Sequence, residues 1–376
     1  MANPFEGLKA ALECIATEAK VLPATGQAME DLMRPDHAEV IDRLRAGDDQ
    51  TLDVLLEAPN RKAYVELKPL HRTEKHLLRY FLDGSARTFF LGDALEGTRR
   101  TPVHVAQVGA AAVFREGDGH VRVAKPVHKV VLMLDKKAVS FGDRVEQLVG
   151  QAGAQYGFHD TMEQDGETEK TSPGKEPRSR AAHKAHHIMA MKEEQLGREL
   201  QREAGEWLVL DGNLGKDLYR WSAVREFLSV AKSFSREPVF KLPGARGGQT
   251  MNLYEFIAGL PFSARTCAFS ARSGKVVVWY VRLREQRHLD YPLMGVVKVE
   301  LPNLGCEAVP SELIDELSSA LVAERQVTPH GQDIRWHAHI YAIYLAEQAV
   351  KNGFASTEVL KAGLKWPTQR AGITIR

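Results

Sequence analysis

The sequence predicts a mixed α/β fold, a sheet flanked by helices, and three features of the chain lead to this expectation. Strand-like apolar runs cluster between residues 80 and 135 and again between 237 and 301, while helical periodicity dominates elsewhere. Two apolar runs end in the same pair, Asp83-Gly84 and Asp211-Gly212. A chain of 376 residues, 44% hydrophobic and 26% charged, is long enough for one large domain or two smaller ones.

Composition places few limits on the partners of the chain. No apolar run reaches the roughly 20 residues that span a bilayer, and residues 1–20 carry Glu and Lys among apolar positions, as an amphipathic helix does. The three cysteines are scattered, so we expect neither a disulfide framework nor a cysteine metal site. We therefore expect a soluble, cytoplasmic protein. A net charge of +1 does not exclude nucleic acid, because binding needs only a local basic surface.

The first half of the chain is expected to begin with helices and to continue with strands. Residues 1–75 predict an N-terminal helical segment. Residues 80–135 predict three consecutive antiparallel strands, with the turn sequence GDG at 117–119 between the last two. A helix is expected over 140–156. Residues 159–180 hold almost no aliphatic side chains and predict a mobile loop.

The second half alternates helices and strands before it ends in helices. The expected elements are a helix over 181–202, a strand over 206–211, a helix over 218–227, a short strand over 227–232, a β-rich insertion over 237–301, a helix from about 310 and a helix over 334–351. Together with the first half, this is the order of an RNase H-like sheet with an insertion before the last helices. We expect that domain to span residues 76–376.

Asp83 and Asp211 need an explanation, because buried strands favour Val, Ile, Leu and aromatic residues over Asp. One explanation is turn chemistry, since Asp-Gly is a favoured turn pair. The other is a metal site, because carboxylates at the ends of adjacent strands can share Mg²⁺ or Mn²⁺, which prefer oxygen ligands. Clustered acids without a metal would raise one another's pKa, and a metal relieves that repulsion. A two-metal site would activate a water and stabilise the leaving oxygen of a phosphodiester.

Several stretches of the chain resemble the NurA family of nucleases. They are FLDGSAR at 81–87, WLVLDGNLG at 207–215, FLSVAKSFSR at 227–236 and YVRLREQRHLDYPLMGVVKVELP at 280–302. The resemblance covers roughly residues 79–351 by order of elements. It implies an RNase H-like fold, dependence on Mn²⁺ or Mg²⁺, and a homodimer. It also implies degradation of DNA from its ends, together with a HerA-type hexameric ATPase that translocates DNA, in end resection or phage defence.

The resemblance further implies a glutamate on the helix before the second Asp-Gly strand, where Glu193, Glu194 and Glu199 are the candidates. On a helical wheel Glu193 lies roughly 50° from the centre of the apolar face, and Glu194 about 150° from it. A metal ligand should lie at the border of the face that packs on the sheet, so this geometry favours Glu193. Glu194 remains the second candidate, and both could instead be solvated helix charges.

Lys232, Ser85 and Arg87 are the candidates for contact with nucleic acid. Lys232 follows a strand, either as an ordinary strand-terminal lysine or as a point charge that contacts the scissile or a flanking phosphate. Ser85 and Arg87 follow Asp83 closely and could contact phosphate as well.

The resemblance also implies a histidine and a tyrosine near the C-terminus, in a Tyr-Pro and Ala-His context from which this chain departs. His339, or else His337, is a candidate for the last metal ligand or for a proton carrier. Both could instead be histidines at the edge of the core with hydrogen-bond partners. Tyr344 and Asp333 are further candidates for this position.

These residues predict a metal-dependent deoxyribonuclease, a hydrolase that cleaves phosphodiester bonds with water as the nucleophile. The alternative is a catalytically weak, RNase H-like DNA-binding adaptor subunit of a translocase complex. A guide-directed nuclease of the Argonaute type would need a guide-binding domain, for which residues 1–75 are too short and too helical in pattern. The chain has no GxxxxGK[ST] loop, so the energy for translocation would come from the partner ATPase.

Overall fold

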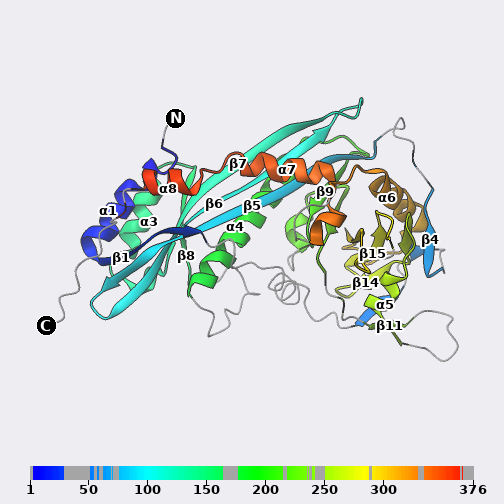
Figure 1. Cartoon of the computed structure of the whole chain (residues 1–376), viewed down its shortest axis with the longest axis horizontal. Coiled ribbons are helices and arrows are strands. Elements are labelled where there is room, and N and C mark those ends of the chain that lie inside the picture. The colour runs from blue at the N-terminus through cyan, green and yellow to red at the C-terminus, as the bar shows by residue number, and fades with distance from the viewer. Residues whose placement is uncertain are drawn as a thin grey trace.

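The fold is described from a computed structural model of the chain. Long strands run along the molecule, and helices lie on both sides of them, as Figure 1 shows. The structure describes residues 3–28, 51–54, 57–58, 62–68, 70, 76–163, 177–214, 218–234, 236, 239–241, 250–287, 290–328, 334–364 and 366.

A long antiparallel meander of β5 (Leu78–Glu96), β6 (Arg99–Arg115) and β7 (Val121–Leu134) forms the centre of the fold. The predicted succession of three antiparallel strands is therefore confirmed. β6 is buried from Thr101 to Val113, because it has a strand on each side and helices on both faces. The expectation that the first strand ends at Asp83 is wrong, since β5 stays paired with β6 as far as Glu96.

Parallel strands extend the sheet on the other side of β5. β9 (Trp207–Asp211) pairs in parallel with the start of β5, and β10 (Phe227–Ala231) pairs in parallel with β9. The strands predicted over 206–211 and 227–232 are thus confirmed. β16 (Val296–Pro302) then pairs antiparallel with β10. The central order is β7-β6-β5-β9-β10-β16, so the sheet is mixed, as predicted.

The predicted β-rich block is also made of strands. The described residues between 239 and 302 include α5 (Leu253–Ala258) and the strands β11 (Val239–Lys241), β12 (Thr250–Asn252), β13 (Ala264–Thr266), β14 (Phe269–Ala271), β15 (Val276–Arg282) and β16. β14, β15 and β16 continue the central sheet beyond β10. The block therefore extends the same sheet.

Helices cover both faces of the sheet, as Figure 1 shows. One face packs against α4 (Pro177–Glu199) and α5. The other packs against α6 (Ser311–Ala323) and α7 (Tyr341–Lys351) near the parallel strands, and against α1 (Lys9–Glu18), α3 (Gly142–Gln151) and α8 (Thr357–Gly363) at the far end of β5. No helix in the described part of the chain is long and apolar enough to cross a membrane.

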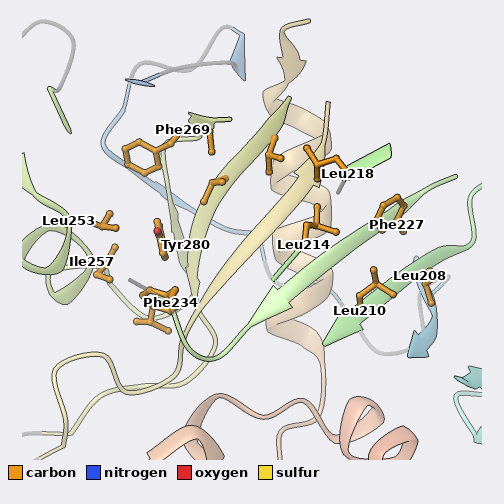
Figure 2. Close-up of a cluster of buried hydrophobic side chains, with 14 of the residues drawn as sticks. Leu208, Leu210, Leu214, Leu218, Phe227, Phe234, Leu253, Ile257, Phe269 and Tyr280 are labelled. Carbon is orange, nitrogen blue, oxygen red and sulfur yellow. The ribbon is translucent and has the colours of Figure 1, made fainter. Parts of the chain in front are cut away.

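Side-chain alternation assigns each strand residue to one of these faces. Leu208 and Leu210 of β9 point to the α4 and α5 side, where they join Phe227 and Tyr280 in the apolar cluster of Figure 2. Val209, between the two leucines, belongs to the cluster under α6 and α7. The same period of two places Asp83 on the α6 and α7 side, with Phe81.

Three predicted helical or loop segments differ from the structure. The helix expected over 218–227 is a short 3₁₀ turn, η4 (Leu218–Trp221), followed by the strand β10. The helix expected over 334–351 is divided into a 3₁₀ turn, η5 (Ile334–Ala338), and α7. The loop expected over 159–180 includes the end of β8 (Tyr156–Asp160) and the start of α4, and residues 164–176 lie outside the described residues.

The predicted N-terminal helical segment is correct only at its start. The described residues hold a 3₁₀ turn, η1 (Glu6–Leu8), and α1, and then the strands β1 (Lys20–Ala28), β2 (Thr51–Val54), β3 (Glu57–Ala58) and β4 (Tyr64–Glu66). β1 pairs antiparallel with the far part of β5, with Lys20 opposite Leu95. The prediction is wrong here because β5 offers an open edge to this segment, and pairing with that edge outweighs the local pattern.

Candidate active site

Asp83 and Asp211 occupy equivalent positions on neighbouring parallel strands. The register pairs Leu82 of β5 with Leu210 of β9, and the two aspartates are the next residues on their strands. β9 ends at Asp211, whereas β5 continues and meets β1 only at Phe89. Among the described strands, β5 between the aspartate and Phe89 is therefore paired on the β6 side only, and the two acids stand at a gap in the sheet.

The surroundings of Asp83 disfavour its charged form. Burial and the negative charge of Asp211 raise the pKa of Asp83 well above its usual value, while Lys232 acts in the opposite direction. Glu347 and Glu193 add further negative charge and raise it too. Four carboxylates and one ammonium thus influence one another here.

Asp211 has one satisfied and one unsatisfied oxygen. Its Oδ2 accepts a hydrogen bond from Lys232 Nζ at 2.9 Å. Its Oδ1 is buried and has no hydrogen-bond partner among the described residues. A buried carboxylate oxygen without a partner is costly, so an additional donor or a cation at Oδ1 would be stabilising.

A cavity of about 30 Å³ lies beside Asp211, on the α4 side of the sheet. It is lined by Leu82, Glu193, Leu210, Asp211, Asn213, Leu214, Trp221 and Ser229. Four of these side chains carry oxygen, and the volume exceeds the roughly 10–15 Å³ that one water requires. The cavity can therefore hold a water or a small cation next to Glu193 and Asp211.

Glu193 reaches this site because α4 crosses β5 at a glycine. A Cβ atom on Gly84 would lie only 2.5 Å from Glu193 Oε1. The other two candidates on α4 have partners elsewhere: Glu194 pairs with Arg198 at 2.5 Å, and Glu199 pairs with Lys125. Of the three glutamates only Glu193 lines the cavity, in agreement with the helical-wheel argument.

Lys232 connects the acids to the C-terminal segment. Its Nζ lies 3.1 Å from His339 Nδ1, and His339 Nε2 lies 3.3 Å from Glu347 Oε2. Glu347 also pairs with Lys351 at 2.8 Å. His339 therefore lies beside the acids, and protein side chains engage both of its ring nitrogens, which fits a positioning or proton-carrying role better than a metal ligand.

The other C-terminal candidates have different surroundings. His337 is buried and accepts a hydrogen bond from the backbone N–H of Gly295 at 3.0 Å, so it supports the segment before β16. The ring of Tyr344 packs edge-on against His339, with centroids 5.9 Å apart. Asp333 lies outside the described residues.

Ser85 and Arg87 follow Asp83 along β5. Alternation places them on the same face of the sheet as Asp83, and both are half-buried. They therefore lie next to the gap where β5 has no partner on the β9 side, in a suitable position to meet an extended polar ligand.

Sequence reasoning did not single out Glu347, Asn213 or Ser229. Glu347 and Lys351 form an i,i+4 pair, which looks like an ordinary pair on a helix surface. Asn213 lies two residues after Asp211, and its polar side chain so close to the acid is the one signal in the sequence that points to it. Ser229 lies within an otherwise apolar strand, and only the fold shows that it lines the cavity.

The acid pair supplies part of the ligand set that a divalent metal ion needs. Mg²⁺ commonly takes one or two carboxylates from a protein and completes its octahedron with waters and substrate phosphates. Asp83, Asp211 and the unsatisfied Oδ1 match that pattern. The described residues contain no group of three His, Cys, Asp or Glu side chains already spaced to hold a metal ion. The chain would thus supply two carboxylates, with Glu193 beside them.

No protein-family model matches the chain, and no curated protein matches it.

Proposed function

We propose that the chain is a metal-dependent deoxyribonuclease built on an RNase H-like sheet. The observation that carries this proposal is the register of Leu82 with Leu210, which makes Asp83 and Asp211 neighbours in surroundings that raise the pKa of Asp83. The strand order β7-β6-β5-β9-β10, with an antiparallel meander followed by two parallel strands, agrees with the order expected for that fold.

In this proposal the side chains divide the work of phosphodiester hydrolysis. Asp83 and Asp211 would hold Mn²⁺ or Mg²⁺, which when bound supplies a polarised water and stabilisation of the leaving oxygen. A carboxyl group must be ionised to act as a ligand, and the surroundings that raise the pKa of Asp83 oppose its ionisation, so metal binding would be coupled to the ionisation of Asp83. Lys232 would contact a phosphate oxygen, and Ser85 and Arg87 would contact the backbone of the nucleic acid along β5.

The resemblance to NurA extends the proposal to partners. The substrate would be DNA degraded from its ends, the working form a homodimer, and the partner a HerA-type hexameric ATPase in the cytoplasm. The process served would be DNA end processing or phage defence.

A catalytically weak DNA-binding adaptor subunit is the second candidate. The ion pair between Lys232 and Asp211 favours it, because the ammonium already neutralises one of the two carboxylates. The two candidates differ in whether the acids are needed for DNA cleavage or only for the local structure.

The test is degradation of a linear duplex with Mn²⁺ or Mg²⁺, with and without a HerA-type ATPase. Wild type is compared with Asp83→Asn and Asp211→Asn, and with Asp118→Asn, an exposed carboxylate in the turn before β7, as the matched control. The nuclease proposal expects metal-dependent cleavage by wild type and the control, and loss in both site variants. If wild type binds DNA but does not cleave it, even with the ATPase, the nuclease proposal is wrong and the adaptor subunit is favoured.

A further inference from the structure

Lys232, His339 and Glu347 form a partly buried chain of contacts that leads away from Asp211. The side chains come from three separate segments: Lys232 directly follows β10, His339 directly follows η5, and Glu347 lies on α7. His339 in the middle is 4% exposed. Water therefore has little access to its ring, and the protein partners decide its hydrogen-bonding pattern.

We propose that Glu347 is a positioning residue that fixes the tautomer of His339, and that His339 in turn orients the ammonium of Lys232 at the acid pair. This inference rests on the proposed nuclease function and deepens it, because it assigns a task to a residue that the acid pair alone does not explain.

The tautomer follows from the chemistry of the two neighbours. The ammonium of Lys232 can only donate, so Nδ1 of His339 must accept. Burial raises the pKa of Glu347, but hydrogen bonds with His339 and Lys351, together with the charges of Lys351 and Lys232, lower the pKa to about 2. Glu347 is therefore a carboxylate that can only accept, and Nε2 of His339 must donate. The neutral Nε2–H imidazole alone satisfies both contacts.

The position of the ring has other supports. The backbone N–H of Val327 donates to the carbonyl of His339 at 2.9 Å, and the rings of Trp336 and Tyr344 pack against the imidazole. These contacts hold the ring in place whichever nitrogen carries the proton. Glu347 and Lys232 together set which nitrogen carries the proton, and the contribution of Glu347 to this choice separates a positioning role from a merely structural one.

The tautomer has a direct consequence for Lys232. With Nδ1 as an acceptor, the ammonium has two acceptors, Asp211 Oδ2 and His339 Nδ1. Its third N–H has no acceptor among the described residues and is free to meet a phosphate oxygen beside Asp83. The other tautomer would direct an N–H at the ammonium, and Lys232 would turn away.

The experiment joins a spectroscopic readout to kinetics. The ring ¹⁵N chemical shifts of His339 are measured in metal-free protein, and its signals among the 14 histidines are assigned by their loss in His339→Gln. The variants are Glu347→Ala and Glu347→Gln, since Gln can still accept from Nε2–H. The control is Glu358→Ala, which removes an exposed carboxylate on α8.

The expected result is the Nε2–H tautomer in wild type and in the control. Glu347→Ala should lose it, and Glu347→Gln should retain it at least in part. We expect kcat to fall about tenfold in Glu347→Ala with KM for DNA unchanged, and Glu347→Gln to recover most of the loss. A wild-type His339 with the proton on Nδ1, or an unchanged tautomer in Glu347→Ala, overturns the inference. If wild type proves inactive, the tautomer measurement still tests the role of Glu347. The nuclease proposal and the tautomer proposal can therefore be rejected independently.

Discussion

Gly84 and Glu193 approach so closely that one methyl group would collide with the carboxylate. A Cβ on Gly84 would lie 2.5 Å from Glu193 Oε1 and 2.7 Å from Met189 Cγ. The backbone of Gly84 is within the extended strand β5, so its conformation does not require glycine. Gly212 is different, because its φ of 89° is in the left-handed region that favours glycine. In the first Asp-Gly pair, glycine thus allows α4 to approach β5 closely. In the second pair, glycine allows the backbone to turn after β9.

Gly84→Ala should therefore displace Glu193 and leave the fold intact. The atoms that a Cβ would meet belong to flexible side chains, which can shift at low cost. We expect metal-dependent cleavage to fall by about 10- to 100-fold, with little change in melting temperature. Gly117→Ala is the matched control, because a Cβ there meets nothing within 4 Å. Full activity in Gly84→Ala would show that Glu193 is not needed.

Asp83→Asn should stabilise the metal-free protein although it removes a ligand. The pKa of Asp83 is raised by burial and by Asp211, so the folded state favours the neutral carboxyl. A raised pKa means that Asp83 contributes most to the free energy of unfolding below pH 3.8, its ordinary pKa. This contribution is lost as the pH rises through the raised pKa of the folded state. The amide carries no charge at any pH. We expect a gain of about 1 kcal/mol at pH 7 that shrinks towards pH 4.

Urea unfolding of wild type and Asp83→Asn at several pH values measures this difference. Glu13→Gln, which removes an exposed carboxylate on α1, serves as the control. A difference that grows as pH falls would have the wrong sign, and would mean that Asp83 is stabilised as an anion.

Mn²⁺ should raise the melting temperature of wild type. A ligand that binds only the folded state adds about 2.7 kcal/mol when its concentration is 100 times the dissociation constant. Asp83 and Asp211 supply the protein oxygens, so neither Asp83→Asn nor Asp211→Asn should show the shift. The measurement is thermal unfolding with increasing Mn²⁺. An equal shift in wild type and both variants would place the bound ion elsewhere.

Local patterns were enough to predict that Asp83 and Asp211 lie on strands, because apolar runs and Asp-Gly pairs are visible within a few residues. That the two strands are neighbours was expected from the RNase H-like order of elements, and the pairing of β5 with β9 agrees with it. The same patterns suggested that Asp83 ends its strand. That was wrong, because pairing with β6 continues through Ser85 and Arg87, which no local preference marks as strand interior. The helix face that carries Glu193 was predictable, since periodicity along α4 is a local property as well.

Contacts between distant segments could not be predicted in this way. β1 is a strand because it pairs with the far part of β5, and its own sequence includes Pro23 and Gly26. Glu347 belongs to the site only because α7 packs over the point where Lys232 and His339 meet. The gap in the sheet has the same origin, since it depends on where β9 ends and β1 begins along β5.

The ion pair between Arg115 and Glu324 should govern stability and leave the active site unaffected. Arg115 ends β6 and Glu324 follows α6, and their side chains meet through two contacts of 2.5 Å with exposures of 11% and 5%. Removal of one partner leaves a buried charge unpaired, so Glu324→Gln should cost about 3–5 kcal/mol. Arg122→Ala, which breaks an exposed pair with Glu116, should change stability little.

The double variant Arg115→Met/Glu324→Leu tests whether the charges themselves are needed. It removes both charges and keeps apolar volume, so we expect it to recover most of the stability that Glu324→Gln loses. Cleavage measured well below the melting temperature should equal that of wild type in both variants, because neither residue contacts Asp83, Asp211 or Lys232. Loss of cleavage in a folded Glu324→Gln protein would instead mean that the junction of β6 and α6 influences the acid pair.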